Sequence, residues 1–334
     1  MRIRKLAALA VLAMGCTAVQ AEPQKLKFAV FEPPQTIASS LWTRWAEKVN
    51  KDGAGAIEIE MYTAGALGRD PRNQLELLLN GVADISFVLP FFSLGRFPDN
   101  TVTNLPLIIG SAREGSIAIW ALYEKGLLRG YDDLLPLALF TAPPTIMVST
   151  RPIPSLASLA GLKVSASTDL QQKMLRALGA APVSGFIPQT SAEALSRGTL
   201  EVDLTNFTAS VSNKQFDVAK NALILPVGPS TLMVAMNKAS YAKLSPAARA
   251  AIDRNKGMPL VKMWFDALDA REDEVRAKWR ADPGRTYTEL SPAEMARAEA
   301  ALMPVMREWE NANPNSAVLI KTLREEVAKA RATR

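Results

Sequence analysis

Short apolar runs alternate along the chain with longer stretches in which apolar residues recur at helical spacing. The short runs predict strands at residues 25–31, 57–62, 84–89, 135–140, 145–150, 162–166 and 231–237. The longer stretches predict helices at residues 37–49, 72–80, 113–125, 169–178 and 191–197. Because a strand followed by a helix recurs, the pattern is typical of an α/β fold with parallel sheets.

The last third of the chain, residues 246–334, has a mostly helical pattern. Residues 261–279 predict one long amphipathic helix with Trp264 and Trp279 near the same face. Ser291, followed by proline and then by a glutamate three residues after it, predicts the start of another helix. We expect these helices to cover the sheets.

The N-terminus has the organisation of a secretory signal. Three basic side chains within the first five residues precede the apolar run 6–14, which is too short for a stable membrane span. Small residues then predict cleavage after Ala21 and export to the periplasm. Cys16 suggests a lipoprotein as an alternative, but Ala13 stands where such a site usually has leucine.

Composition limits the partners. The chain has 334 residues, 48% of them hydrophobic, which is typical of one large globular domain or two of ordinary size. Without residues 1–21, its 36 basic and 33 acidic side chains leave a net charge of only +3. Those charges are scattered, so the sequence indicates no nucleic-acid or membrane-surface binding. No further apolar segment of 18 residues or more occurs, and we expect the mature chain to be soluble.

Candidate catalytic chemistry is sparse. The sequence has no His and a single Cys, which excludes His-based triads, His-rich zinc sites and Cys clusters. It contains no phosphate-binding glycine loop and no G-x-S-x-G motif. The acidic pair Asp132-Asp133 is typical of a solvated loop, and Asp99-Asn100 lacks the ligand spacing of a calcium loop. We therefore expect no enzyme, no cofactor and no metal.

Several short segments carry a family resemblance. They are GALG (65–68), LLNGVAD (78–84), GRFP (95–98), LPL (105–107), RPI (151–153), LAGLKV (159–164), LGAAP (178–182), ALSRG (194–198) and LSP (244–246). Taken in order, they resemble the substrate-binding subunits of TRAP (tripartite ATP-independent periplasmic) transporters, the DctP-like family. The resemblance spans nearly all of the chain after residue 21.

This resemblance implies a periplasmic-binding-protein-like α/β fold: two α/β lobes, joined by hinge strands and a long lobe-spanning helix, with the ligand in the cleft between them. Lobe I would comprise residues 22–141 and about 231–268, and lobe II residues 142–230 and about 269–334. The implied protein is a monomeric binder, without enzymatic activity, that delivers a small organic solute to the large and small TRAP membrane subunits. The alternatives are a binder for an ATP-driven importer or a sensor kinase, or a secreted enzyme.

The sequence departs from this family at three polar positions. In most members an Arg that follows the LKV segment holds the carboxylate of an organic acid; here that position is Ser165. A second family Arg falls at about Pro144, and a ligand-contacting Asn falls at Thr205, beside Asn206 and Phe207. Burying an unpaired carboxylate costs on the order of several kcal/mol. Either the solute is not a simple dicarboxylate or another cation supplies the charge.

Two hypotheses for the site remain open. In one, Arg72, or with less support Arg69, reaches the ligand from the opposite lobe. In the other, the ligand is neutral or aromatic. The residues for this second hypothesis are the stacking faces Phe31, Phe91, Phe92, Phe186 and Phe207 and the hydrogen-bonding residues Ser93, Ser165, Thr205 and Asn206.

Overall fold

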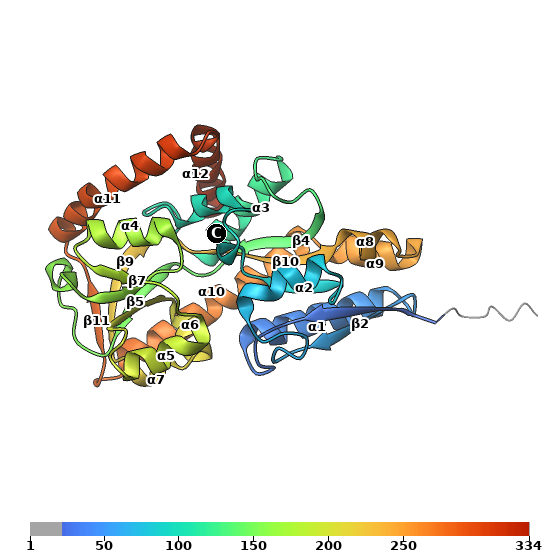
Figure 1. Ribbon diagram of the computed structural model, residues 1–334, viewed down its shortest axis with the longest axis horizontal. Coiled ribbons are helices and arrows are strands. Elements are labelled where there is room, and N and C mark those ends of the chain that lie inside the picture. Colours follow the sequence, from blue (N-terminus) through green and yellow to red (C-terminus); the bar gives the residue numbers. More distant parts are fainter. Residues whose placement is uncertain (1–21, 334) are drawn as a thin grey trace, which may run out of the picture.

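The computed structural model describes residues 22–333, which form two β-sheets with helices packed around them (Figure 1). The expected signal sequence and Cys16 lie outside the described residues. In spatial order, the first sheet consists of β2 (Ile57–Tyr62), β1 (Gln24–Ala29), β3 (Ile85–Val88), β10 (Thr231–Asn237) and β4 (Leu134–Thr141). The second consists of β11 (Thr286–Glu289), β9 (Asn221–Val227), β5 (Thr145–Ser149), β8 (Val202–Thr205), β6 (Lys163–Ser165) and β7 (Ala181–Val183).

Both sheets are mixed, so the prediction of parallel sheets is only partly right. β1 pairs in parallel with β2 and β3, but β10 is antiparallel to both β3 and β4. In the second sheet, β5 is antiparallel to β8 and β9, whereas β6 is parallel to β7 and β8. The antiparallel strands β5 and β10 are the ones that the chain enters directly from the other sheet, β5 after β4 and β10 after β9.

The helices are mostly those that the apolar spacing predicts. They are α1 (Ile37–Asp52), α2 (Gln74–Leu79), α3 (Ala112–Glu124), α4 (Asp169–Ala177), α5 (Pro188–Ser196), α6 (Phe207–Ser212), α7 (Gln215–Val218), α8 (Lys238–Ala242), α9 (Pro246–Asn255), α10 (Met258–Ala281), α11 (Pro292–Ala312) and α12 (Ser316–Ala332). Thr36 caps α1 by accepting a hydrogen bond from the Ser39 amide. The buried face of α1 places Trp45 against Phe28 of β1, with ring centroids 5.9 Å apart.

The chain crosses between the sheets twice in adjacent segments. One crossing joins β4 to β5 and the other joins β9 to β10; the Ala142 amide donates to the Ser230 carbonyl across them, at 3.1 Å. Gly228 lies where the second crossing touches the backbone of residues 103–105. A Cβ on Gly228 would lie 2.2 Å from the Thr103 carbonyl oxygen, so only glycine fits this contact.

The long helix α10 provides a third connection between the sheets. It begins after Gly257, whose amide donates to the Leu137 carbonyl in β4 at 2.6 Å. Farther along, the indole of Trp264 donates to Thr141 of β4 at 2.8 Å, and the indole of Trp279 donates to Thr286 of β11 at 2.8 Å. One helix is therefore attached to both sheets.

The last two helices return from the second sheet to the first. α11 packs against α4, and α12 packs against α3, so the C-terminal end lies near the middle of the molecule (Figure 1). A Lys173–Glu308 ion pair of 2.8 Å links α4 to α11, and a Lys125–Glu326 ion pair of 2.6 Å attaches α12 beside the end of α3.

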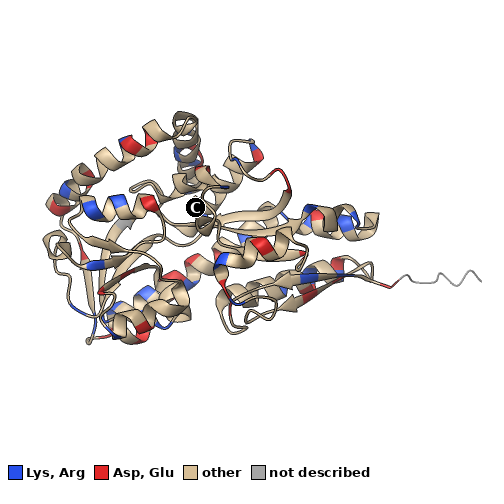
Figure 2. Ribbon diagram, viewed as in Figure 1, with Lys and Arg blue, Asp and Glu red and all other residues tan. Residues whose placement is uncertain are grey.

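Acidic and basic side chains are intermixed over the helices, without a large region of one sign in this view (Figure 2). This distribution agrees with the scattered charge of the sequence. Within residues 22–333, no helix is both long and apolar enough to cross a membrane.

Candidate functional site

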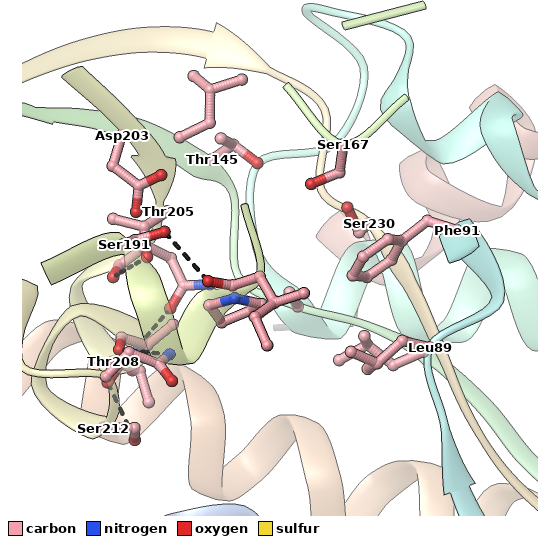
Figure 3. A pocket seen from close by; sticks show the side chains of 18 of the residues that line it. Leu89, Phe91, Thr145, Ser167, Ser191, Asp203, Thr205, Thr208, Ser212 and Ser230 are labelled. Carbon is pink, nitrogen blue, oxygen red and sulfur yellow. Dashed lines mark hydrogen bonds between the residues drawn. The ribbon is translucent and has the colours of Figure 1, made fainter. Parts of the chain in front are cut away.

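A cavity lies between the two sheets, beside the crossing strands. It encloses about 1200 Å³ of empty space, part of which is open to solvent. Phe31, Leu89 and Phe91 line it from the first sheet, and Ser165 and Thr205 line it from the second. Figure 3 shows Leu89 and Phe91 facing Asp203, Ser191 and Thr205 across this space. A concave site between two layers, lined by both apolar and polar side chains, is typical of a small-molecule binding site.

The apolar wall is aromatic and tightly packed. Phe31 stacks on Phe87 with ring centroids 5.4 Å apart and an interplanar angle of 7°. Trp264 of α10 also lines the cavity and stacks on buried Trp42, at 5.2 Å and 2°. Because these rings are held by other rings, the wall is preorganised to receive a flat apolar group.

The opposite wall contains a buried carboxyl group, Asp203 of β8, which is 3% exposed. The Ser165 hydroxyl donates to Asp203 Oδ1 at 2.5 Å, and the Gln215 amide donates to Oδ2 at 2.7 Å. Ser165 is adjacent because Val164 of β6 pairs with Val202 of β8. Burial raises the pKa of Asp203 to about 6, although hydrogen bonds from Ser165, Gln215 and Ser191 stabilise the ionised form.

Gln215 leaves one acceptor unused in the described structure. Its side chain is 1% exposed and lines the cavity, and its Oε1 atom has no hydrogen-bond partner among residues 22–333. A buried amide oxygen without a hydrogen-bond partner is unfavourable. A solute that donates a hydrogen bond would satisfy it.

The ionisable residues that line the cavity are both acidic. Asp203 approaches from the second sheet, and Glu32, in the loop after β1, approaches from the first. Burial raises the pKa of Glu32 above its ordinary value. No Lys or Arg occurs among the described residues that line this cavity.

Helix α6 begins at the cavity, but its first amides already have acceptors. Asn206 caps the helix by accepting from the Ala209 amide at 2.7 Å. Glu272 of α10 accepts from the Phe207 amide at 3.0 Å and from the Thr208 amide at 2.8 Å. The start of α6 therefore offers few free donors to a solute.

The structure brings together five of the residues that the sequence suggests for the site. Ser165, Thr205, Asn206, Phe31 and Phe186 all line the cavity. Phe91, which the sequence analysis also raised, lines it as well.

Five other suggested residues lie outside the cavity lining. Arg72 is exposed and pairs with Asp70 at 2.6 Å. Arg69 is also outside the lining. Phe207 is buried behind the site, against Trp279 and Tyr287.

Phe92 and Ser93 follow Phe91 in a short 3₁₀ turn. Phe92 packs against the core, and the Ser93 amide donates to the Pro90 carbonyl at 2.8 Å. The turn directs only the first of its two phenylalanines to the cavity.

Asp203, Glu32 and Gln215 line the cavity but were not predicted from the sequence. An Asp inside the apolar run Val202–Thr205 is the one signal that could have indicated a buried polar site. Glu32 and Gln215 lie in segments with no distinctive pattern. Among the described residues, no group of three or more acidic or Cys side chains is placed to hold a metal ion.

Comparison with known proteins gives a family match. The model of the bacterial extracellular solute-binding protein family 7, DctP, matches residues 28–312. A protein of Comamonas testosteroni named outer membrane transporter protein TsaT is 25% identical over 313 residues, covering 92% of this chain and 91% of that protein.

Two solved structures are also similar, each with 28% identity over 93% of this chain and 99% of the other. One, with a TM-score of 0.86, is a marine metagenome TRAP solute-binding protein specific for aromatic acids, in complex with 3-hydroxybenzoate. The other, with a TM-score of 0.85, is a TRAP solute-binding protein from Rhodoferax ferrireducens in complex with copurified benzoate.

Proposed function

The chain belongs to family 7 of the bacterial extracellular solute-binding proteins, and we propose that it binds a small aromatic solute in the inter-sheet cavity and presents it to TRAP membrane subunits. The observation that carries this proposal is the aromatic wall of Phe31, Phe91 and Trp264 facing a polar wall from the other sheet. The aromatic ligands of the two similar solved structures support the same solute class.

The two sheets correspond to the two lobes of the proposed binder. The first would comprise residues 22–141 and about 231–268, and the second residues 142–230 and about 269–334. The crossings near Ala142 and Ser230 support the first boundaries, since the chain changes sheets there. The C-terminal boundary is less simple, because α12 packs against α3 of the first lobe.

Solute binding would stabilise the arrangement in which both walls contact the ligand. Contacts that exist only when the lobes are together shift the population toward the closed form. The closed form would then be the one that the membrane subunits recognise. In this account the protein is a monomeric periplasmic binder that catalyses no reaction, and it is exported by cleavage after Ala21.

A thermal-shift screen of the purified protein against aromatic, aliphatic and sugar solutes tests this function. Aromatic solutes should raise the melting temperature most. Ala209→Trp should abolish the shift, since Ala209 lines the cavity from α6 and the larger side chain would fill it. Ala247→Trp, on the exposed side of α9, is the matched control and should leave the shift unchanged.

A different result would contradict the proposal. If aliphatic dicarboxylates stabilise the protein more than any aromatic solute, the solute class is wrong. If Ala209→Trp retains the full shift, the solute binds elsewhere. Copurification with the large and small TRAP subunits tests the partner.

A further inference from the structure

The polar end of the cavity combines carboxyl groups with an amide oxygen that has no partner. Asp203 contributes a carboxylate, and Gln215 contributes an amide oxygen without a partner in the described structure. Glu32 adds a second carboxyl group from the opposite wall.

The hydroxyl donors nearest Asp203 are already used within the protein. The single proton of the Ser165 hydroxyl goes to Asp203, as does a proton of the Gln215 amide. The Thr208 hydroxyl donates to Glu272 at 2.9 Å, and the Thr205 hydroxyl donates to the Asn206 carbonyl at 3.4 Å. A carboxylate beside Asp203 that accepted from these hydroxyls would have to break the bonds that they already make.

Charge favours the same conclusion. A solute carboxylate beside Asp203 would be a like charge in a water-poor cavity, and Glu32 would add to the repulsion. No Lys or Arg from the described part of the chain lines the cavity to offset it. A group that carries N–H donors would instead be attracted by Asp203 and would satisfy Gln215.

The rest of the cavity can accept a ring with a second polar group. Ser167 and Ser230 lie on the side of Phe91, away from Asp203 (Figure 3). Their hydroxyls are neutral, and they suit a ring hydroxyl rather than a charged group.

We propose that the cavity selects aromatic solutes whose polar end carries N–H donors, a protonated amine or a primary amide, and rejects the corresponding carboxylates, with Asp203 and Gln215 as the acceptors. This inference rests on the proposed function, since it assumes an aromatic solute in this cavity. It makes Asp203 the residue that determines the charge of the solute.

Calorimetric titration with benzylamine, benzamide and benzoate at pH 7.5 tests the proposal, because the three probes share one ring and differ in the polar group. Benzylamine or benzamide should bind at least tenfold more tightly than benzoate. A preference for benzylamine identifies a cation site, and a preference for benzamide identifies a neutral donor site. Both results support the proposal.

Two variants identify the acceptor. Asp203→Asn keeps the shape of the side chain and should weaken binding of the preferred probe at least tenfold. Asp84→Asn is the matched control because Asp84 also accepts a serine hydroxyl, from Ser240 at 2.5 Å, but lies outside the cavity lining. The affinities of Asp84→Asn for the three probes should stay within twofold of those of the unmodified protein. Gln215→Met provides an independent variant if Asp203→Asn does not fold, and it should weaken the preferred probe at least threefold.

The outcomes separate this inference from the proposed function. If benzoate binds most tightly, the donor preference is overturned while an aromatic binder remains. If neither Asp203→Asn nor Gln215→Met changes the affinity, the assigned acceptors are wrong. If none of the three probes binds, the aromatic function fails and this inference fails with it.

Discussion

Asp269 and Glu272 lie three residues apart on α10, and each accepts backbone hydrogen bonds from the first turn of another helix. The helix at Asp269 is α3, which packs on the first sheet, and the helix at Glu272 is α6, which follows β8 of the second sheet. Asp269 accepts from the Ala112 amide at 2.8 Å and from the Arg113 amide at 3.1 Å, where α3 begins. Glu272 does the same at α6. Two neighbouring carboxylates of α10 therefore cap one helix beside each sheet and fix the position of α10 relative to both.

Replacing Glu272 by Gln should destabilise the protein by about 3 kcal/mol, because one of its two oxygens would become a donor facing the backbone N–H groups of α6. Glu274→Gln on the same helix is the control. Glu274 is an exposed partner of Arg271 and Lys278, and replacing it should destabilise the protein much less than replacing Glu272 does. Urea unfolding measures both. If both variants lose the same free energy of unfolding, the capping of α6 by Glu272 contributes little to stability.

The pH dependence of stability should report on Asp203. Its pKa is about 6 in the folded protein against an ordinary value of 3.8, so the folded state holds more protons between these two values. The free energy of unfolding should therefore fall as pH rises from about 4 to 6, by about 3 kcal/mol from this group alone. Asp203→Asn should remove that part of the slope. If the free energy of unfolding changes with pH equally in the variant and in the unmodified protein, the raised pKa is not that of Asp203.

Gly228→Ala should destabilise the protein by about 1–3 kcal/mol, because the added methyl would meet the backbone at Thr103 and Asn104. Gly95→Ala is the matched control, since a Cβ there meets no atom within 4 Å. Thermal unfolding compares the two variants. A small effect at Gly228 would mean that the crossing strand can move away from its neighbour without cost.

Phe91→Ala should weaken aromatic solutes about tenfold, because it removes one face of the cavity. Phe92→Ala, its neighbour in the chain and outside the cavity lining, should reduce affinity far less than Phe91→Ala does, since its ring supports that of Phe91, 4.5 Å away, without facing the solute. Calorimetric titration of both variants distinguishes ring contact from general loss of packing. Similar losses of affinity in both would contradict the placement of the solute against Phe91.

Sequence patterns identify most of the strands that coincide with short apolar runs and miss several of the others. The predicted ranges for β2 and β10 agree with the structure, and those for β3 and β4 differ by one residue at each end. β8 was missed because it has only four residues and contains Asp203 in an otherwise strand-like run. The predicted sheet direction was only partly right because the crossing between β9 and β10 has no local signal.

The site could be predicted only in part. Ser165 was identified through its place in a family motif, and it does line the cavity. Its partner Asp203 is 38 positions away, and only the pairing of β6 with β8 brings them together. The suggestion of Arg72 as a cation for the ligand depended on its reaching across, whereas its guanidinium pairs locally with Asp70.

A crystal structure of the protein with the most stabilising aromatic solute tests the central claim most directly. The account predicts the ring between Phe91 and the wall formed by Ser191 and Thr205, with the polar end of the solute within hydrogen-bond distance of Asp203. A solute bound outside this cavity, or an aliphatic dicarboxylate occupying it in preference to aromatic solutes, would contradict the account.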